Sequence, residues 1–293
     1  MKKDIDYTWS SQLIELPDTA IVKIKMFGSH ADTKTSMSNP TGIEALTSRK
    51  RISGTQYVDG NGEVHDYDYS RESRSITSVK DSIKKIREYI QYNFTDYECW
   101  HITLTYAEQK FDFAKTAHDF DLFIDRLKTR YKQYSLQYLR IIEPHANGAW
   151  HIHILVKSAA CEEQLRLSET DITKIWGKGN ATARQVANIN ELVTYFGTVH
   201  SSIKNDGHKL SKTEIKQQRW HYYPKGGNIF AKSNSIVPPP DGTTTKAELS
   251  KYLSEHNYDT ESSKQSSLFV SDTETGVIYN QINYQRFEKQ ADL

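Results

Sequence analysis

The segment that most constrains the fold of this chain is 150–156, which reads Trp-His-Ile-His-Ile-Leu-Val. Such a run is typical of a β-strand, in which alternate side chains share a face. His151 and His153 are therefore expected on one face, and the isoleucine after each of them on the other, against a core. Two neighbouring imidazoles are half of a metal site with positions left open for a substrate. The same pair is also compatible with two polar residues on a solvated strand.

A carboxylate is expected beside these histidines. Residues 136–143 are also β-rich and a turn-like sequence follows them, so 136–143 and 150–157 are predicted to form an antiparallel hairpin. Glu143 then ends one strand where His151 begins the facing one, and cross-strand neighbours lie within a few ångströms. The set of Glu143, His151 and His153 suits Mn²⁺ or Mg²⁺ when a phosphate adds oxygen ligands, and Zn²⁺ would accept the same groups.

Helices and strands alternate on both sides of this hairpin. Further strands are predicted at 100–106 and 181–186, and helices at 78–94 (with Ser78 as N-cap), 113–131, 162–176 and 189–203. This order predicts an α+β fold of the split βαβ type, with a central antiparallel sheet of about five strands and helices on one face.

The flanking regions are weaker in pattern. Residues 20–26 look like a strand, and the Pro-rich segment 237–242 is a candidate boundary. We therefore expect an N-terminal extension at 1–76, a central domain at 77–236 and a C-terminal extension at 237–293.

Composition limits the class of protein. The chain has 293 residues, a formal net charge of +1 and two cysteines that form no C-x-x-C pair. No apolar signal region or run of about 18 apolar residues is present, so we expect a cytoplasmic protein with no membrane partner. The net charge is neutral on nucleic acid binding, but residues 201–235 carry seven basic side chains against two acidic ones.

Tyr195 is the candidate nucleophile, on the helix predicted after the last strand. A phenol has a pKa of about 10 and needs a polarised phosphate or a nearby base to react. An aromatic residue on an amphipathic helix is more often part of the core, so this alternative stands beside the catalytic one.

In their order along the chain, these segments resemble the HUH endonuclease superfamily, in particular rolling-circle replication initiator (Rep) proteins of bacterial plasmids and phages. Residues 100–106 (WHITLTY) resemble its aromatic-rich first motif, and 143–153 its metal motif, where a carboxylate precedes G-x-x-H-hydrophobic-H. Tyr195 stands where the third motif has the catalytic tyrosine, and 222–230 resembles a segment that follows it. The resemblance covers about residues 78–236.

The resemblance implies a nicking domain at 77–236. Glu143, His151 and His153 would hold the metal, and Tyr195 would attack a phosphate of single-stranded or hairpin origin DNA. The products would be a 5′-phosphotyrosine and a 3′-hydroxyl primer. A host polymerase would extend the primer. A host helicase would unwind the duplex, since the sequence contains no G-x-x-x-x-G-K-[ST] motif.

Contacts to DNA are expected from the basic and aromatic residues after the tyrosine helix. Cations would bind phosphates and aromatic rings would stack on unpaired bases. The candidates are Lys204, Arg219, Trp220, Tyr222 and Lys225. The alternative for 220–223 is a small core strand.

One departure from the family pattern keeps other readings open. Many members carry a lysine three or four residues after the tyrosine, where this chain has Thr198 and Val199. Tyr222 and Tyr223 are therefore alternative nucleophiles. One alternative function is a non-catalytic origin-binding protein with a degenerate HUH domain. Another is a metal-independent 2H-type phosphoesterase, because 101–104 matches the H-x-T-hydrophobic element of that class.

Overall fold

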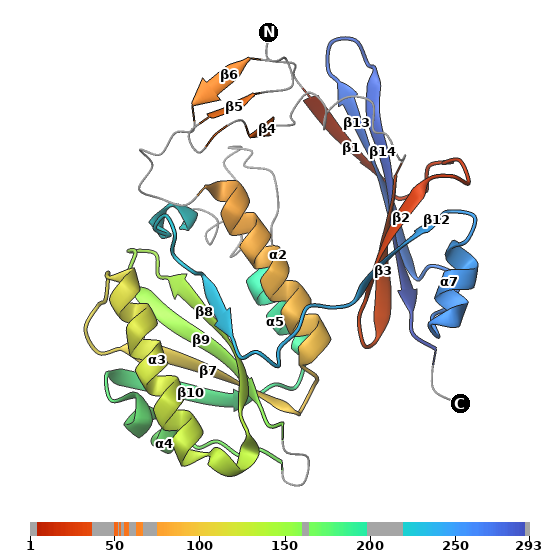
Figure 1. The fold of residues 1–293 in the computed structure, drawn as a ribbon. Helices are drawn as coiled ribbons and strands as arrows, with labels where there is room; N and C mark the ends of the chain where they lie inside the picture. Colours follow the sequence, from red (N-terminus) through yellow and green to blue (C-terminus); the bar gives the residue numbers. More distant parts are fainter. Residues whose placement is uncertain are drawn as a thin grey trace. The chain divides into compact units, whose positions relative to one another are not determined.

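The hairpin around the two histidines lies at the centre of a five-stranded sheet in the computed structural model (Figure 1). The structure describes residues 5–36, 50–51, 53, 56–58, 63–66, 75–159, 164–197 and 219–290. Two compact units divide the chain: residues 70–238 form one, and residues 1–69 with 239–293 form the other.

All neighbouring strands of the five-stranded sheet are antiparallel. The predicted α+β class and the five-stranded sheet are therefore confirmed. The register sets Glu143 opposite His151, and Thr103 opposite His153. In spatial order the strands are β10 (Gly179–Gln185), β7 (Cys99–Tyr106), β9 (Trp150–Lys157), β8 (Gln137–Pro144) and β11 (Phe230–Lys232).

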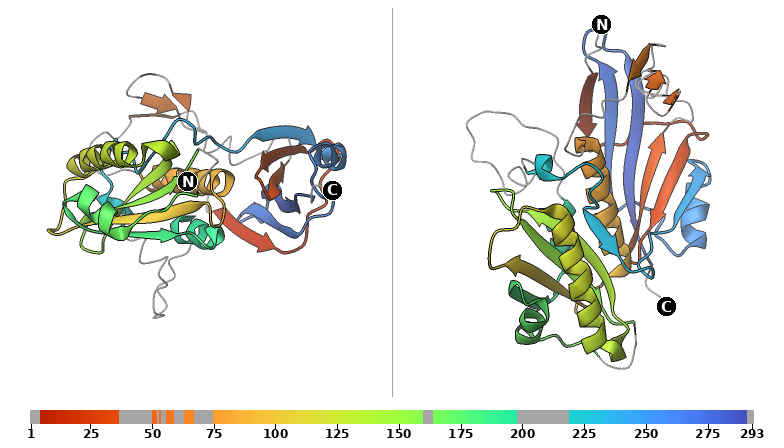
Figure 2. Two further views of the ribbon diagram at one scale, coloured as in Figure 1. Left: turned by 90° about the horizontal axis from the view of Figure 1, so that it is seen from below. Right: turned by 60° about the vertical axis from the view of Figure 1, so that its left-hand side comes forward.

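Helices cover both faces of this sheet, and the prediction that they share one face is wrong. The strand β9 is buried on both of its faces, so each face requires apolar cover. Figure 2 shows a helix above the sheet and another below it in its left view. The helices α3 (Phe113–Arg130) and α4 (Glu169–Trp176) lie on the face of Ile152 and Ile154, whereas α2 (Ile76–Asn93) and α5 (Ile189–Gly197) lie on the histidine face.

Side-chain contacts fix these assignments. The guanidinium of Arg140, which pairs with Ile154, lies 5.2 Å from the ring of Phe120 on α3. On the opposite face, the ring of Phe196 on α5 lies 5.2 Å from the ring of His153. Fully burying an aliphatic or aromatic side chain contributes about 1.5–3 kcal/mol, so apolar residues on both faces hold this unit together.

Two predicted helix starts are wrong. The N-cap of α2 is Ser75, whose hydroxyl accepts a hydrogen bond from the Ser78 amide at 3.2 Å, so Ser78 lies inside the first turn. The helix predicted from residue 162 begins only at Glu169. Before it, Leu165 and Leu167 are buried without helical structure, so their apolar pattern reflects core packing rather than helical periodicity. The helix predicted at 189–203 is described as far as Gly197.

The other unit combines segments from both ends of the chain in a six-stranded antiparallel sheet. The pairing of an N-terminal with a C-terminal strand occurs at three places in this sheet, between β1 and β13, β3 and β14, and β2 and β12. The order is β1 (Ile5–Ser10), β13 (Lys264–Asp272), β14 (Ile278–Glu288), β3 (His30–Ser36), β2 (Ile21–Met26) and β12 (Asp241–Thr245).

A short helix and a small sheet complete this unit. The helix α7 (Leu249–Glu255) packs Leu253 against a cluster that includes Ile24 and Phe287. The strands β4 (Lys50–Arg51), β5 (Gln56–Val58) and β6 (Val64–Asp66) form a separate three-stranded sheet. The functional limits expected from the sequence, at 1–76, 77–236 and 237–293, stay a prediction.

Candidate metal centre

Three buried side chains converge at the turn end of the β8–β9 hairpin. Glu143 ends β8, and its register partner His151 lies one residue into β9, with His153 two residues further on the same face. One ligand atom from each of the three residues lies within 4.8 Å of the others. We refer to Glu143, His151 and His153 as the Glu-His-His cluster.

The donor set of this cluster suits a divalent metal. Glu143 Oε2 lies 3.1 Å from His153 Nε2 and 3.7 Å from His151 Nε2. All three residues are buried, at 9 % exposure or less, and His151 Nδ1 has no hydrogen-bond partner among the described residues. A buried carboxylate and two imidazoles with spare ligand atoms are the groups that transition metals and Mg²⁺ bind, so these residues fit a metal.

A second layer of side chains contacts His153 from β7. His101 Nε2 and Thr103 Oγ1 lie 3.1 and 3.2 Å from His153 Nδ1, on the side of the ring away from Glu143. Such outer contacts fix the tautomer and orientation of a ligating histidine. This role was missed from the sequence. The register of β7 against β9 was the signal, because residues 101 and 103 alternate onto the histidine face.

His145 was also missed from the sequence. Its ring stacks on His151, with centroids 4.1 Å apart and an interplanar angle of 27°. Burial lowers the pKa of His145, and the neighbouring His151 and Arg219 act in the same direction. No sequence pattern marks this residue, since it sits in the turn between the strands.

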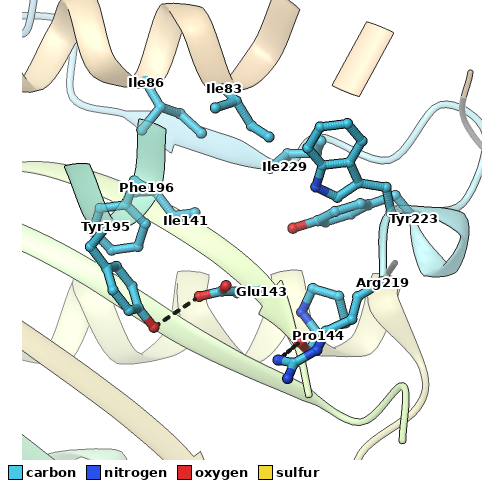
Figure 3. Close-up of a pocket in the computed structure, with 11 residues that line it drawn as sticks. Ile83, Ile86, Ile141, Glu143, Pro144, Tyr195, Phe196, Arg219, Tyr223 and Ile229 are labelled. Atoms are coloured by element: carbon cyan, nitrogen blue, oxygen red, sulfur yellow. Dashed lines mark hydrogen bonds between the residues drawn. The ribbon is translucent and has the colours of Figure 1, made fainter. Parts of the chain in front are cut away.

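Tyr195 meets the cluster from α5, as predicted for a residue on this helix. Its hydroxyl donates a hydrogen bond to Glu143 Oε2 at 3.3 Å (Figure 3), and its ring centroid lies 5.7 Å from that of His153. Tyr195 is 42 % exposed, whereas the next residue, Phe196, is 9 % exposed and packs in the core. The core position on this helix therefore belongs to Phe196.

The surroundings of Tyr195 favour its neutral form. Burial raises the pKa of the phenol, and the Glu143 carboxylate raises it further, while the Arg219 guanidinium acts in the opposite sense. A small cavity of about 40 Å³ is bordered by Glu143, Tyr195 and Arg219 together with apolar residues such as Ile83 and Ile141. Figure 3 shows the guanidinium beside Pro144, whose carbonyl oxygen accepts a hydrogen bond from Arg219 Nη1 at 3.2 Å.

The other expected DNA-binding residues are distributed differently. Trp220 is buried and belongs to the core, so it presents no ring face for stacking on a base, which corrects the expectation from the sequence. Residues Trp220–Tyr222 form a short 3-10 helix rather than a core strand. Lys225 is exposed. Lys204, with Thr198 and Val199, lies outside the described residues.

The two alternative nucleophiles bind backbone carbonyls. Tyr223 is buried and its hydroxyl donates to the Ile142 carbonyl oxygen at 3.0 Å. Tyr222 is half-buried and donates to the Ala146 carbonyl oxygen at 3.3 Å. These contacts anchor the segment after α5 to the β8–β9 hairpin, whereas the hydroxyl of Tyr195 meets the Glu-His-His cluster.

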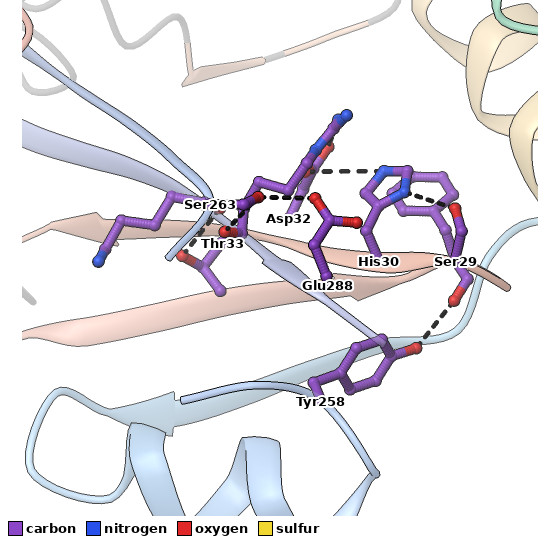
Figure 4. A network of polar contacts seen from close by, with 10 residues as sticks. Ser29, His30, Asp32, Thr33, Tyr258, Ser263 and Glu288 are labelled. Atoms are coloured by element: carbon purple, nitrogen blue, oxygen red, sulfur yellow. Dashed lines mark hydrogen bonds and ion pairs between the residues drawn. The ribbon is translucent and has the colours of Figure 1, made fainter. Parts of the chain in front are cut away.

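The six-stranded sheet carries a polar network of a different kind. Arg286 donates to both carboxylate oxygens of Asp32, at 2.7 and 2.9 Å, across the β3–β14 pair, and this contact raises the pKa of Arg286. His30 accompanies the pair at 3.8 Å, and Glu288 accepts from Ser263 nearby (Figure 4). A bidentate arginine–carboxylate pair is a sufficient structural role for this network.

No helix among the described residues is both long and apolar enough to cross a membrane.

Comparison with known proteins places part of the chain in a family. Residues 99–199 match the family described as replication-associated protein ORF2/gene 2 protein. No curated protein matches the chain. A solved structure, described as the N-terminal nuclease domain of non-structural protein 1 of minute virus of mice, covers 82 % of this chain and 78 % of its own. Its sequence identity is 8 % and its TM-score 0.16, a likeness that carries no argument.

Proposed function

We propose that this chain, whose residues 99–199 belong to the replication-associated protein family named above, initiates rolling-circle replication by nicking one strand of an origin DNA. The observation that carries the proposal is the hydrogen bond from the Tyr195 hydroxyl to Glu143 Oε2, which brings a phenol against the Glu-His-His cluster. Tyr195 and all three residues of the cluster lie within the matched segment.

Glu143, His151 and His153 would hold the divalent metal, Mn²⁺ or Mg²⁺, through one carboxylate and two imidazoles. Bound there, the metal would polarise the scissile phosphate and offset the charge that develops on it. Burial of the cluster supports this role, because electrostatic interactions are stronger where water is excluded.

Tyr195 would be the nucleophile. Its Oη forms a bond to phosphorus, and the bond from phosphorus to the 3′-oxygen breaks. Glu143 Oε2, which accepts the hydrogen bond of the phenol, would take the phenolic proton first, and the departing 3′-oxygen gains a proton to become a hydroxyl. The phosphotyrosine conserves the energy of the broken bond, so rejoining needs no high-energy cofactor.

The products connect the site to replication. The free 3′-hydroxyl would prime a host polymerase, and a host helicase would unwind the duplex because the sequence has no P-loop motif. Arg219, at the edge of the site, and Lys225, on the surface, would contact phosphates of the single strand. Lys204 keeps the same proposed role from its sequence position.

A nicking assay tests the proposal. Single-stranded oligonucleotides that tile the DNA on both sides of the coding gene are incubated with the full chain and Mn²⁺. At least one should yield a covalent protein–DNA adduct that migrates more slowly on a denaturing gel. Tyr195→Phe should abolish the adduct, and Tyr97→Phe, a change at an exposed tyrosine outside the site, should retain it.

The outcomes separate the alternative readings. An adduct that persists in Tyr195→Phe and disappears in Tyr222→Phe would overturn the choice of nucleophile. Binding to an origin oligonucleotide with no adduct would favour a non-catalytic origin-binding protein.

The 2H phosphoesterase reading has one observation in its favour, since His101 and Thr103 lie on the same sheet face as the histidine pair. The second element of that class would be 151–153, which has His153 where threonine is needed. Phosphodiesterase activity that survives EDTA would support it, whereas the nickase should lose its activity.

A further inference from the structure

A groove of about 560 Å³ opens beside the Glu-His-His cluster, between the end of β7 and the β8–β9 turn. Its volume falls within the usual range for small-molecule sites, about 300–1,000 Å³. The residues that line it are Thr105, Tyr106, Gln109, Lys110, His145, Ala146, Asn147, Ala149, Trp150 and Arg219.

The charges of the groove favour an anion. Lys110 and Arg219 are cationic, and none of the described residues that line the groove is acidic. Arg219 Nε is buried and has no hydrogen-bond partner among the described residues, so this group has a donor to offer. Two cations without a neighbouring carboxylate are the groups that bind phosphate oxygens.

The groove leads directly to the proposed reaction centre. At one point its wall is the ring of His145, which stacks on the metal-cluster residue His151 at 4.1 Å. Arg219 borders the groove and also the small cavity that contains Glu143 and Tyr195. A chain of phosphates that passes the cluster would therefore continue into the groove.

Fixed backbone contacts hold the walls. The Trp150 amide donates to the Lys110 carbonyl oxygen at 2.7 Å, and the Trp150 indole donates to the Phe111 carbonyl oxygen at 2.9 Å. At the turn, Gly148 has a φ of +86°, and a Cβ there would lie 2.7 Å from the Tyr222 ring, so only glycine fits. The groove is thus formed before a ligand arrives.

We propose that this groove binds the nucleotide that adjoins the scissile phosphate of single-stranded DNA. Lys110 and Arg219 contact its phosphates, while Tyr106, Gln109 and Asn147 border its sugar and base. The inference rests on the proposed nicking function, because that function supplies the DNA strand and the direction in which it leaves the cluster.

The test measures binding apart from chemistry. A 5′-fluorescein-labelled oligothymidine of twelve nucleotides is titrated with the full chain in EDTA, and fluorescence anisotropy is recorded over a range of salt concentrations. Lys110→Gln and Arg219→Gln should each weaken binding about tenfold, the loss of one charge-assisted hydrogen bond. Each should also reduce the slope of log affinity against log salt by about 0.7, the value for one phosphate contact on a single strand.

Lys174→Gln is the matched control, because Lys174 is an exposed lysine of α4 that does not line the groove. Arg219→Lys retains the cation and should keep the salt slope even if it alters packing at Pro144. The proposal is overturned if both glutamine variants bind with the affinity and salt slope of Lys174→Gln. An adduct in the nicking assay with unchanged oligothymidine binding would refute the groove alone. Groove-dependent binding without any adduct would refute the nicking function alone.

Discussion

Adding Mn²⁺ should raise the thermal stability of the protein, and Glu143→Gln should remove most of that increase. The three ligand atoms of the cluster lie within 4.8 Å of one another on two paired strands at the centre of the sheet. The metal would therefore bind the folded sheet and not the unfolded chain, in which Glu143 and the histidines are no longer held together. A ligand that binds only the folded state stabilises it by mass action.

The size of the effect follows from the free metal concentration. At one hundred times the dissociation constant, the stabilisation is about 2.7 kcal/mol, and each further tenfold adds about 1.4 kcal/mol. A unit the size of residues 70–238 changes its melting temperature by about 2–4 °C for each kcal/mol, so the increase should be about 5–11 °C. With two imidazoles in the set, Zn²⁺ should bind more tightly than Mn²⁺, and Mg²⁺ should bind most weakly in the absence of a phosphate.

The assay is differential scanning fluorimetry over a metal titration, with EDTA samples as the baseline for each variant. Glu108→Gln makes the same chemical change at an exposed carboxylate outside the cluster and should keep the full increase. If none of the three metals raises the melting temperature, or if Glu143→Gln responds like Glu108→Gln, the assignment of the cluster as a metal site is wrong.

Three further results are expected. His101→Ala should weaken Mn²⁺ binding about 10-fold in calorimetry, since loss of an outer contact to a metal-ligating histidine costs about 10–100-fold; unchanged affinity would show that the contact with His153 is immaterial. Ile154→Ala should lower the free energy of unfolding in urea by about 2–5 kcal/mol, because this side chain is fully buried on the central strand; a loss near zero would contradict that packing. In a Cys161→Ser background, iodoacetamide at pH 8 should alkylate Cys99 very slowly, because burial raises the pKa of its thiol to about 12 and the thiolate is the reactive form; rapid alkylation of the native protein would disprove the burial.

The part of the fold that the sequence predicts well is the part with local signals. The alternation through His151 and His153 indicates a strand, and the short turn before it predicts a hairpin. Together they set the register that brings Glu143 opposite His151. The position of Tyr195 on a helix follows from apolar periodicity in the same way.

Long-range features carried no such signal. The pairing of β1 with β13 joins residues more than two hundred positions apart, and neither strand's pattern names its partner. Apolar residues at Leu165 and Leu167 predicted a longer helix because core packing without helical structure leaves a similar pattern. Helices on both sheet faces follow from the burial of β9 on both sides, which a seven-residue apolar run does not distinguish from a half-buried strand.

The site shows the same division. The three cluster residues come from one hairpin and could be found together, whereas His145 and Arg219 depend on how the turn and the segment after α5 pack. The contacts of His101 and Thr103 lay between these cases, because they follow once β7 is registered against β9. Trp220 was expected at the DNA surface because composition does not separate a stacking ring from a core ring.

The most direct test of the central claim is to identify the residue that carries the DNA. The adduct formed with Mn²⁺ on an origin oligonucleotide is digested with protease and nuclease, and the peptides are sequenced by tandem mass spectrometry. We predict a single modified peptide with a 5′-phosphonucleotide on the oxygen of Tyr195, together with a free 3′-hydroxyl on the released strand. A phosphonucleotide on another residue, or a released strand that ends in a 3′-phosphate, would contradict the proposed mechanism.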